Sequence, residues 1–385
     1  MTLTLGLLAG EASGDNLGAG LMRALKDLHV VDGDIRFVGV GGSRMQSQGL
    51  ELLAPMDALA VNGFREPILR LPQLILLYRR LVKEFTHAGL DGFIGIDFNV
   101  FNFLLESALK RRGLKTAHYV SPSVYAWRAG RTKRVAKSAD LLLCLYPFEP
   151  DFYAGTAVHA EYVGHPLADE IDPQAGANSG RQAARERLGV NANDTVLALL
   201  PGSRNSEVRL MLAPFLAAAR LFAASHSPAH IVIPCLRPEI RATIEQGVQA
   251  YPDLQLTLYD GNARQALLAA DVALVKSGTS TLEAMLLHRP MVVSYRLGGF
   301  SYQLAKRVVR TPFIALPNIL AGRALVPELL QYAATGEALA QALTVELRQA
   351  RESSTYIERF EKLHDQLRQG ADVKAAIAVL RLLQQ

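Results

Sequence analysis

Cysteine is nearly absent from this chain of 385 residues, and that scarcity limits what the protein can be. Only Cys144 and Cys235 occur, far apart and each within an apolar, strand-like run. A disulfide framework and a Cys-rich zinc site are therefore excluded as organising features, and a reducing compartment is expected. No set of His or carboxylate residues stands at metal-ligand spacing, so we expect neither a metal nor another cofactor.

Long hydrophobic runs are missing as well. The strongest apolar stretch, residues 67–78, is too short to span a bilayer and is interrupted by Arg70 and Pro72. The apolar residues 3–8 follow no basic segment, so we expect a first strand there and not a signal peptide. Residues 67–78 could still lie on a membrane surface.

Several short catalytic signatures are absent too. The chain has no nucleophile elbow and no P-loop, and residues 10–15 do not complete the glycine pattern of a dinucleotide site. The net charge is +5 at pH 7 and the pI is near 9.2. This net positive charge is compatible with an anionic partner, whether phosphorylated substrate, membrane surface or nucleic acid. Taken alone, the net charge is better explained as ordinary surface charge.

What the chain does contain is a repeated alternation of short apolar runs and helix-length segments. The apolar, β-branched runs are residues 3–9, 35–40, 93–96, 115–120, 141–145, 195–200, 231–234, 256–259, 271–275 and 291–295. Such alternation predicts parallel βαβ units. Residues 166–190 interrupt it with Pro, Gly and charged residues typical of a linker. From residue 327 onward the pattern is helical.

These features predict an α/β fold with two Rossmann-like, doubly wound domains and C-terminal helices. We place the first domain at residues 1–168, the second at 169–365, and a C-terminal helix at 366–385 that could pack back on the first domain. Ligands of such sheets bind outside the carboxyl ends of the strands, so the strand-end loops are expected to face one central cleft.

Residues 277–283 have the strongest functional pattern, with an apolar run before them and a helical segment after them. Ser277, Gly278 and Thr279 are small enough for a ligand to approach the backbone, and the unpaired N–H groups of a first helical turn suit a phosphate. Glu283 could then accept hydrogen bonds from a ribose diol. Taken by itself, this pattern is explained equally well by a strand–turn–helix without a ligand, in which Ser277 or Thr279 is the N-cap.

A second loop suited to phosphate follows another predicted strand. Gly202 lets the turn close, and Ser203 with the guanidinium of Arg204 could hold a diphosphate before Glu207 opens a helix. An exposed loop arginine is the plain alternative. Two such loops in one domain are uncommon by chance, which favours the functional interpretation.

In the first half, Asp97 ends an apolar strand. Its carboxylate is either a solvated turn residue or a base that points toward a ligand. Asn99 and Asn102 flank it and could donate or accept hydrogen bonds there.

Polar residues also follow the first predicted strand, in a tight turn. Glu11 and Asp15 are candidate substrate contacts, and helix capping by Ser13 or Asp15 is the alternative. His118 is better explained as a satisfied core histidine than as a catalytic one, and His165, near the expected domain junction, is also assigned a structural role.

A cluster of basic residues lies near two aromatic ones. Nucleic acid or an anionic, phospholipid-like surface would suit it, and a solvated helix face is the commonest explanation of such runs. The cluster consists of Arg128, Arg131, Lys133, Arg134 and Lys137, beside Tyr125 and Trp127.

Taken together and in order, these segments resemble the lipid-A-disaccharide synthase family. The match runs from the first strand almost to the C-terminal helices, and the ordered set is specific although each piece is weak. The pieces are AGEASGD (9–15), GGSRM (41–45), HYVSPSVYAWR (118–128), PFE (147–149), VGHP (163–166), LPGSR (200–204), SGT (277–279), Glu283 and LPNILAGR (316–323).

The resemblance implies a GT-B glycosyltransferase, peripheral on the cytoplasmic face of the inner membrane of a Gram-negative bacterium. It implies transfer of 2,3-diacylglucosamine from its UDP conjugate to 2,3-diacylglucosamine 1-phosphate (lipid X). The products would be the β-1,6-linked disaccharide 1-phosphate and UDP. The reaction would be inverting and metal-independent, with no nucleic-acid partner, and homo-oligomerisation stays open.

The resemblance also distributes roles among the candidate residues. Asp97 would be the base on the acceptor's 6-hydroxyl. Acceptor contacts would come from Glu11, Ser13, Asp15 and Asn102. The donor side would be lined by Ser203, Arg204, Ser277, Gly278, Thr279, Glu283, Asn318 and Arg323. Acyl chains would meet the apolar residues 68–78, so the double change Leu69→Ser with Leu76→Ser should release the protein from membranes.

One stretch departs from the family pattern. The family carries a second Asp three residues after the one matching Asp97, whereas this chain has Val100 there and Asn99 in place of a proline. Because Asp97, Phe101 and Asn102 are retained, we still expect activity.

Two other interpretations remain open at this point. A UDP-sugar epimerase or hydrolase on the same scaffold would share the donor pocket and release UDP without an acceptor. A non-catalytic UDP-sugar or lipid-binding protein would bind UDP without turnover, and the departure at Val100 is its main support.

Overall fold

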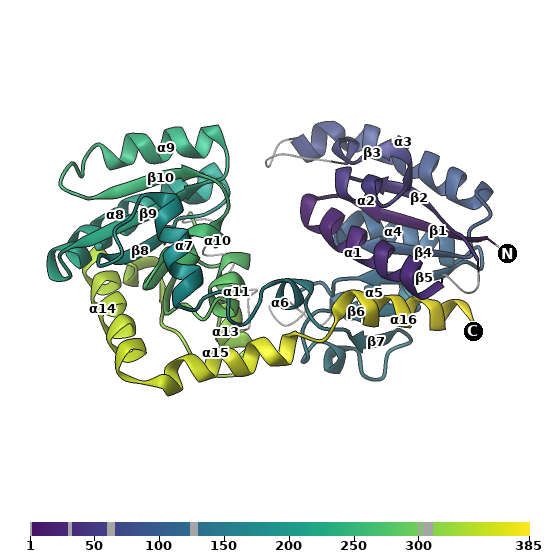
Figure 1. Ribbon diagram of the computed structural model, residues 1–385. Helices are drawn as coiled ribbons and strands as arrows, with labels where there is room; N and C mark the ends of the chain where they lie inside the picture. Colours follow the sequence, from purple (N-terminus) through teal and green to yellow (C-terminus); the bar gives the residue numbers. More distant parts are fainter. Residues whose placement is uncertain (1, 30–32, 60–65, 124–129, 299–301, 303–310) are drawn as a thin grey trace. The chain divides into compact units, whose positions relative to one another are not determined.

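The computed structural model describes residues 2–29, 33–59, 66–123, 130–298, 302 and 311–385. The chain divides into two compact units, one made of Met1–Asp169 with Leu367–Gln385 and the other of Glu170–Gln366. Each unit contains one parallel β-sheet with helices around it (Figure 1).

The sheet of the first unit has seven parallel strands in the order β3-β2-β1-β4-β5-β6-β7. Its strands are β1 (Leu3–Ala9), β2 (Ile35–Gly41), β3 (Leu50–Pro55), β4 (Gly92–Ile96), β5 (Lys115–Tyr119), β6 (Leu141–Cys144) and β7 (His159–Tyr162). The order reverses between β1 and β4. That reversal is the place where doubly wound sheets bind ligands.

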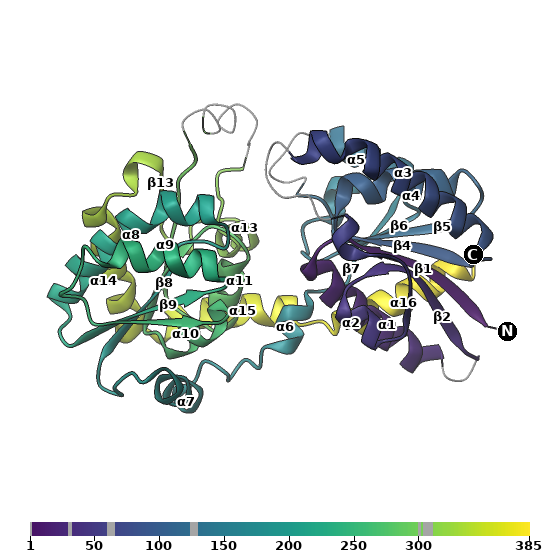
Figure 2. The same cartoon turned by 90° about the horizontal axis from the view of Figure 1, so that it is seen from above.

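Helices cover both faces of this sheet, α1, α2 and α16 on one side and α3, α4 and α5 on the other (Figure 2). The helices of the first unit are α1 (Ala12–His29), α2 (Ser43–Ser47), α3 (Glu66–His87), α4 (Asn99–Lys110), α5 (Gly130–Ser138), α6 (Pro166–Glu170, at the boundary) and α16 (Ala371–Leu383), with 3-10 turns η1 (Met56–Ala58) and η2 (Pro150–Tyr153). Helix α16 packs against α1, so the end of the chain completes the core of the first unit.

The second sheet has six parallel strands in the order β10-β9-β8-β11-β12-β13. They are β8 (Thr195–Leu200), β9 (Ala229–Cys235), β10 (Leu256–Asp260), β11 (Val272–Lys276), β12 (Met291–Tyr295) and β13 (Glu328–Leu330). Here the reversal lies between β8 and β11, so the loops after these two strands flank the predicted ligand position.

The helices of the second unit pack in two groups, α8 against α9 and α14, and α10 against α7 and α11. They are α7 (Asn178–Leu188), α8 (Asn205–Ser225), α9 (Pro238–Val248), α10 (Ala263–Ala269), α11 (Thr279–Leu286), α13 (Leu316–Ala321), α14 (Gly336–Glu352) and α15 (Ser354–Leu367, ending at the boundary), with 3-10 turn η3 (Gln331–Ala333). Helix α8 is long and apolar enough to cross a membrane, but its side chains Met211, Phe215 and Phe222 are fully buried in the core of this unit.

The expected pair of doubly wound parallel sheets is confirmed, and each of the ten predicted strands is present. Three strands escaped prediction, namely β3, β7 and β13, and each lies at the edge of its sheet. The expectation of a wholly helical tail from residue 327 was wrong, because β13 and η3 precede α14. The turn at residues 10–15 was also drawn too long, since α1 already begins at Ala12.

Candidate functional site

In the second unit, the loops after β8 and β11 carry the predicted diphosphate-binding residues to the reversal of strand order. Gly202 has φ 138°, and a Cβ there would lie 2.8 Å from the Cβ of Glu207, so glycine is needed at this turn. The turn leaves Ser203 and Arg204 exposed at the entrance to α8. Both are therefore accessible to a ligand.

A carboxylate joins the two loops. Glu207 Oε1 pairs with Lys276 Nζ at 3.0 Å and with Arg204 Nη1 at 3.8 Å, while its Oε2 accepts from the backbone N–H of Ser203. Lys276 also lies 4.7 Å above the ring of Tyr295. This network fixes the two cations on either side of the reversal, where a diphosphate would need them.

The segment after β11 has the predicted strand–turn–helix form. Ser277 donates its hydroxyl hydrogen to the carbonyl of Ile314 at 2.9 Å, and Gly278 stands at the N-cap of α11 with Thr279 as the first helical residue. Gly278 and Thr279 are exposed. The side chain of Ser277 is thus engaged, and the backbone N–H groups of the first turn are the part of this segment suited to bind an anion.

Glu283 lies one turn into α11 with its side chain mostly buried. Burial raises its pKa, Arg264 opposes that rise and Glu170 adds to it. The nearest cation, Arg264 Nε, is 4.0 Å from Glu283 Oε1, and Arg264 Nη1 is held by Glu170 at 2.6 Å. Glu283 has no close partner among the described residues, so its oxygens remain available to hydroxyl donors.

Asn318 was expected to line the donor side, but its side chain lies in the interior of the second unit. It is 1% exposed, and its side chain donates to Val326 O and Glu328 Oε1 and accepts from the N–H groups of Leu325 and Val326. These bonds fix the connection between α13 and β13, so we no longer expect Asn318 to contact the donor directly.

Arg323 follows the helix C-cap Gly322 and is exposed, which leaves it free to reach a ligand.

In the first unit, Asp97 stands directly at the reversal of strand order, after β4. Asp97 and Phe98 have φ of 49° and 45°, a left-handed conformation that is rare outside glycine and concentrates at functional sites. A Cβ on Gly10 would lie 2.5 Å from the ring of Phe98, so the two strand-end loops pack tightly. Ser13 on α1 donates its hydroxyl hydrogen to Asp97 Oδ2 at 3.4 Å.

A chain of hydrogen bonds leads from Asp97 into the core. The Asn99 amide donates to Asp97 Oδ1 at 3.4 Å, and Asn99 Oδ1 lies 3.2 Å from His118 Nε2. His118 Nδ1 is in turn 2.6 Å from Glu106 Oε1, and both of these side chains are fully buried. His118 is therefore a paired core histidine, as expected, and it also orients the residue next to the proposed base.

Two predicted acceptor contacts are buried, and we now assign them positioning roles. Asn102 is 0% exposed, and its amide donates to the carbonyls of Leu8, Ile96 and Asp97. It thereby ties the ends of β1 and β4 together.

Asp15 accepts from the backbone N–H groups of Gly42, Arg44 and Met45 and is 5% exposed. It anchors the turn before α2. Glu11 and Ser13 are exposed and stay candidate acceptor contacts.

The surface features expected to meet lipid are only partly described. Tyr125, Trp127 and Arg128 lie outside the described residues, as do the side chains of Leu69 and Arg131. Lys133, Arg134 and Lys137 are exposed on α5. Large apolar side chains are exposed on two neighbouring helices, namely Leu71, Ile75 and Leu76 on α3 and Val100 and Leu104 on α4.

Three functional candidates were missed in the sequence. Lys276 fell between the predicted strand 271–275 and the loop that begins at Ser277 and was assigned no role, Glu207 was noted only as a helix start, and Glu106 was not noted at all. Each acts through a partner distant in the sequence, so no local pattern signals it. Among the described residues, no group of three or more His, Cys, Asp or Glu side chains could hold a metal ion.

Comparison with known sequences gives one family over nearly the whole chain. A family model described as lipid-A-disaccharide synthetase matches residues 5–380. The lipid-A-disaccharide synthase of Azotobacter vinelandii is 48% identical over 382 residues, covering 99% of this chain and 98% of that protein. The enzyme of the same name from Pseudomonas aeruginosa is 47% identical with the same coverage.

Solved structures show the same fold at low sequence identity. The UDP-GlcNAc 2-epimerase of Neisseria meningitidis, solved with UDP-GlcNAc, superposes with a TM-score of 0.64 at 12% identity and covers 100% of both chains. MurG of Acinetobacter baumannii superposes with a TM-score of 0.54 at 14% identity, covering 100% of this chain and 99% of that one. These likenesses support the GT-B fold.

Proposed function

This chain belongs to the lipid-A-disaccharide synthase family and is a glycosyltransferase of lipid A disaccharide synthesis, and from that premise we propose which substrates and residues carry its reaction. The donor is UDP-2,3-diacylglucosamine and the acceptor is 2,3-diacylglucosamine 1-phosphate (lipid X). The acceptor's 6-hydroxyl displaces UDP at the anomeric carbon, and the products are the β-1,6-linked disaccharide 1-phosphate and UDP.

The second unit binds the donor. Arg204 and Lys276, held by Glu207, stand beside the exposed first turn of α11, and this combination suits a diphosphate. The same cations and N–H groups stabilise the negative charge that develops on the leaving UDP. Glu283 accepts hydrogen bonds from the ribose hydroxyls. Arg323 adds a further cation at the exposed end of α13.

The first unit supplies the base. Asp97 is half-buried at the reversal of strand order, and Ser13 and Asn99 each contact one of its carboxylate oxygens. It accepts the proton of the 6-hydroxyl as the new bond forms. General-base assistance of this kind is typically worth about 10²–10⁴-fold in rate.

The position of Val100 supports activity despite the departure from the family pattern. Its side chain is 71% exposed in the first turn of α4, whereas the contacts that hold Asp97 come from Ser13, Asn99 and Asn102. The second carboxylate of the family would therefore stand on the surface, outside the hydrogen bonds that orient the base.

The acyl chains and the membrane meet the first unit. The apolar side chains exposed on α3 and α4 offer a surface for hydrocarbon, and Lys133, Arg134 and Lys137 on α5 attract phosphate head groups. We place the enzyme peripherally on the cytoplasmic face of the inner membrane of a Gram-negative bacterium.

The observation that carries the mechanism is the placement of Asp97 and of the Arg204–Glu207–Lys276 network at the reversals of their two sheets. Direct displacement with one base inverts the anomeric centre. Proton NMR of the disaccharide formed from the α-linked donor tests this, because a β-linkage is expected and an α-linked product would contradict the mechanism. The likeness to epimerases, at 12% identity, concerns the fold and favours no second function.

A further inference from the structure

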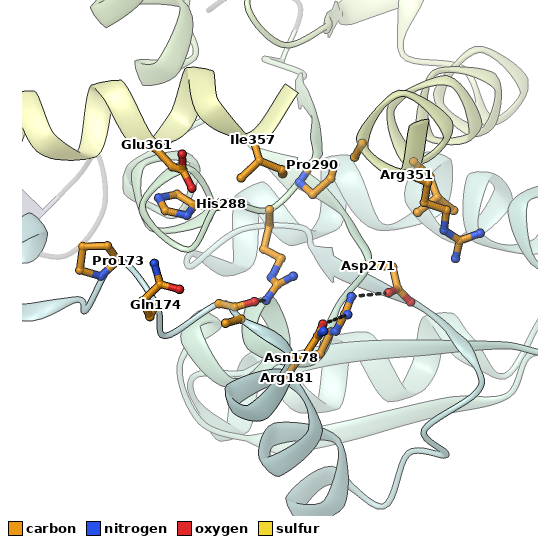
Figure 3. A pocket seen from close by; sticks show the side chains of 15 residues that line it. Pro173, Gln174, Asn178, Arg181, Asp271, His288, Pro290, Arg351, Ile357 and Glu361 are labelled. Carbon is orange, nitrogen blue, oxygen red and sulfur yellow. Dashed lines mark hydrogen bonds and ion pairs between the residues drawn. The ribbon is translucent and has the colours of Figure 1, made fainter. Parts of the chain in front are cut away.

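A cavity of about 300 Å³ lies in the second unit at the end of the sheet away from the donor-binding loops (Figure 3). It is bordered by Asp271, directly before β11, and Pro290, directly before β12, whereas the donor-binding loops follow the other ends of β8 and β11. Strands of five residues separate the two places by about 15 Å. Helices α7, α14 and α15 contribute further lining residues, including Arg181, Arg351 and Glu361.

Asp271, one of the carboxylates that line this cavity, already binds two arginines. Asp271 Oδ1 accepts from Arg181 Nη1 at 3.1 Å, and its Oδ2 accepts from Arg185 Nη2 at 2.7 Å and from the N–H of Val196 at 2.8 Å. Asp271 therefore neutralises part of the charge of Arg181 and Arg185.

A third arginine, Arg289, lines the same cavity without a carboxylate partner among the described residues. It is 6% exposed, its Nη2 donates to the carbonyl of Gly176, and its Nε is buried without any partner. Burial and the neighbouring Arg181 lower the pKa of Arg289 to about 10, although Asp271 opposes that fall. A buried cation beside other cations is costly unless an anion joins it.

The rim adds further donors. The side chain of Arg351 points from α14, and its one described contact is a 3.5 Å hydrogen bond to Thr195 Oγ1. Asn178 accepts from Arg181 through its oxygen, which leaves its amide nitrogen as a donor beside Gln174. Among the described residues, Glu361 is the only other carboxylate of the lining, so arginines outnumber carboxylates there even before Arg185 is counted.

We propose that this cavity is an anion-binding site for a soluble phosphate-bearing small molecule. Arginine guanidinium groups bind phosphate oxygens in pairs of parallel hydrogen bonds, and Arg289, Arg181 and Arg351 surround a space of suitable size. None of the large apolar side chains that are exposed in the described part of the chain lines this cavity, and its lining includes three arginines, so it suits a soluble anion better than acyl chains. The site is therefore distinct in chemistry from the lipid-facing surface of the first unit.

The test is equilibrium dialysis of the full chain with radiolabelled inorganic phosphate at constant ionic strength, carried out in an Arg204→Ala background that weakens phosphate binding at the donor site. One phosphate per chain is expected to bind. Arg351→Gln should weaken this binding at least about tenfold, since a charge-assisted hydrogen bond is lost. Arg289→Met should abolish it. Arg348→Gln removes the same charge from the same helix outside the cavity and should leave binding unchanged.

Arg289 is buried, so its variant could fail to fold, and Arg351→Gln then decides the matter because Arg351 is exposed. Absence of saturable phosphate binding, or binding unaltered by Arg351→Gln, would overturn the proposal. Sedimentation with phosphatidylglycerol vesicles separates the two sources of phosphate. Equal vesicle binding by Arg351→Gln and the unaltered chain supports a soluble ligand. Loss of vesicle binding by Arg351→Gln, with phosphate binding retained, would contradict a soluble ligand.

Discussion

The hydroxyl of Ser13 and the carboxylate of Asp97 meet at 3.4 Å although 84 residues separate them in the sequence. Ser13 belongs to the first turn of α1, and Asp97 follows β4, the strand that neighbours β1. The reversal of strand order thus brings together two loops that no local pattern connects. The carboxylate oriented there is the proposed base.

Asn99→Ala tests the hydrogen-bond chain that orients Asp97. The substitution removes the link between Asp97 and His118, so the base loses its orientation while the donor site is untouched. We expect kcat to fall about tenfold with little change in KM for the donor, and Asn99→Ser to restore part of the loss. Steady-state kinetics at several donor concentrations measures both constants. Unaltered kcat in Asn99→Ala would show that the chain has no role in orienting the base.

Arg204→Ala tests the donor site. Arg204 is exposed, and its side chain's one ion pair among the described residues is a 3.8 Å contact with Glu207, so its removal should not disturb folding. Loss of one charge-assisted hydrogen bond to the diphosphate should weaken UDP binding by about 10–100-fold, as measured by calorimetric titration. Arg209→Gln, an exposed arginine on the same helix, is the matched control. Equal UDP affinity in Arg204→Ala and the unaltered chain would place the diphosphate elsewhere.

The double change Leu71→Ser with Leu76→Ser tests the membrane-facing surface. Both side chains are more than half exposed on α3, so the change removes apolar contact area without opening the core. We expect the protein to move from the membrane fraction to the soluble fraction after centrifugation. Leu210→Ser with Leu221→Ser removes two leucines that are also exposed, though less than half, from α8 of the second unit and should not alter partitioning. Identical partitioning of the two double variants would contradict a membrane-binding role for the apolar surface of α3.

The burial of Glu149 leads us to expect that the free energy of unfolding depends on pH. It is 2% exposed, its Oε2 accepts from the N–H groups of Leu145 and Tyr146, and burial raises its pKa to about 8. Between the unfolded value near 4.5 and about 8, the folded state binds more protons than the unfolded state, so the free energy of unfolding falls as pH rises through this window.

The loss attributable to Glu149 should amount to a few kcal/mol, about 1.4 kcal/mol for each pH unit. Glu149→Gln keeps an acceptor for both N–H groups and should flatten this part of the profile in denaturant titrations from pH 5 to 8. Glu352→Gln, an exposed glutamate of the second unit, is the control and should retain the slope. A slope unchanged in Glu149→Gln would contradict the prediction.

The sequence predicted the central strands and the edge strand β10, and it missed the other three edge strands for one physical reason. Strands such as β1 and β11 are buried on both faces and read as continuous apolar runs. In β3, β7 and β13 the burial is partial, so no continuous apolar run or clean alternation marks them. Their pairing is decided by the neighbouring strand.

The sequence pointed to the exposed candidate residues of the site but not to the residues that support them. Ser203, Arg204 and Asp97 could be proposed because they lie in strand-end loops, and the structure places them in such loops. Asn318 and Asn102 were taken for ligand contacts, but a single sequence does not reveal burial, and both use their amides on the backbone. The pairing of Glu106 with His118 depends on the packing of α4 against β5, which no local spacing encodes.

The most direct measurement is a reaction of the purified chain with UDP-2,3-diacylglucosamine and lipid X, without added metal, followed by mass spectrometry of the lipid products. The unaltered chain is expected to form the tetra-acylated disaccharide 1-phosphate. Asp97→Asn should form it about 10²–10⁴-fold more slowly with unchanged UDP affinity, and Asp57→Asn, on the exposed surface of the same unit, at the normal rate. No disaccharide from the unaltered chain, or a normal rate from Asp97→Asn, would contradict the account.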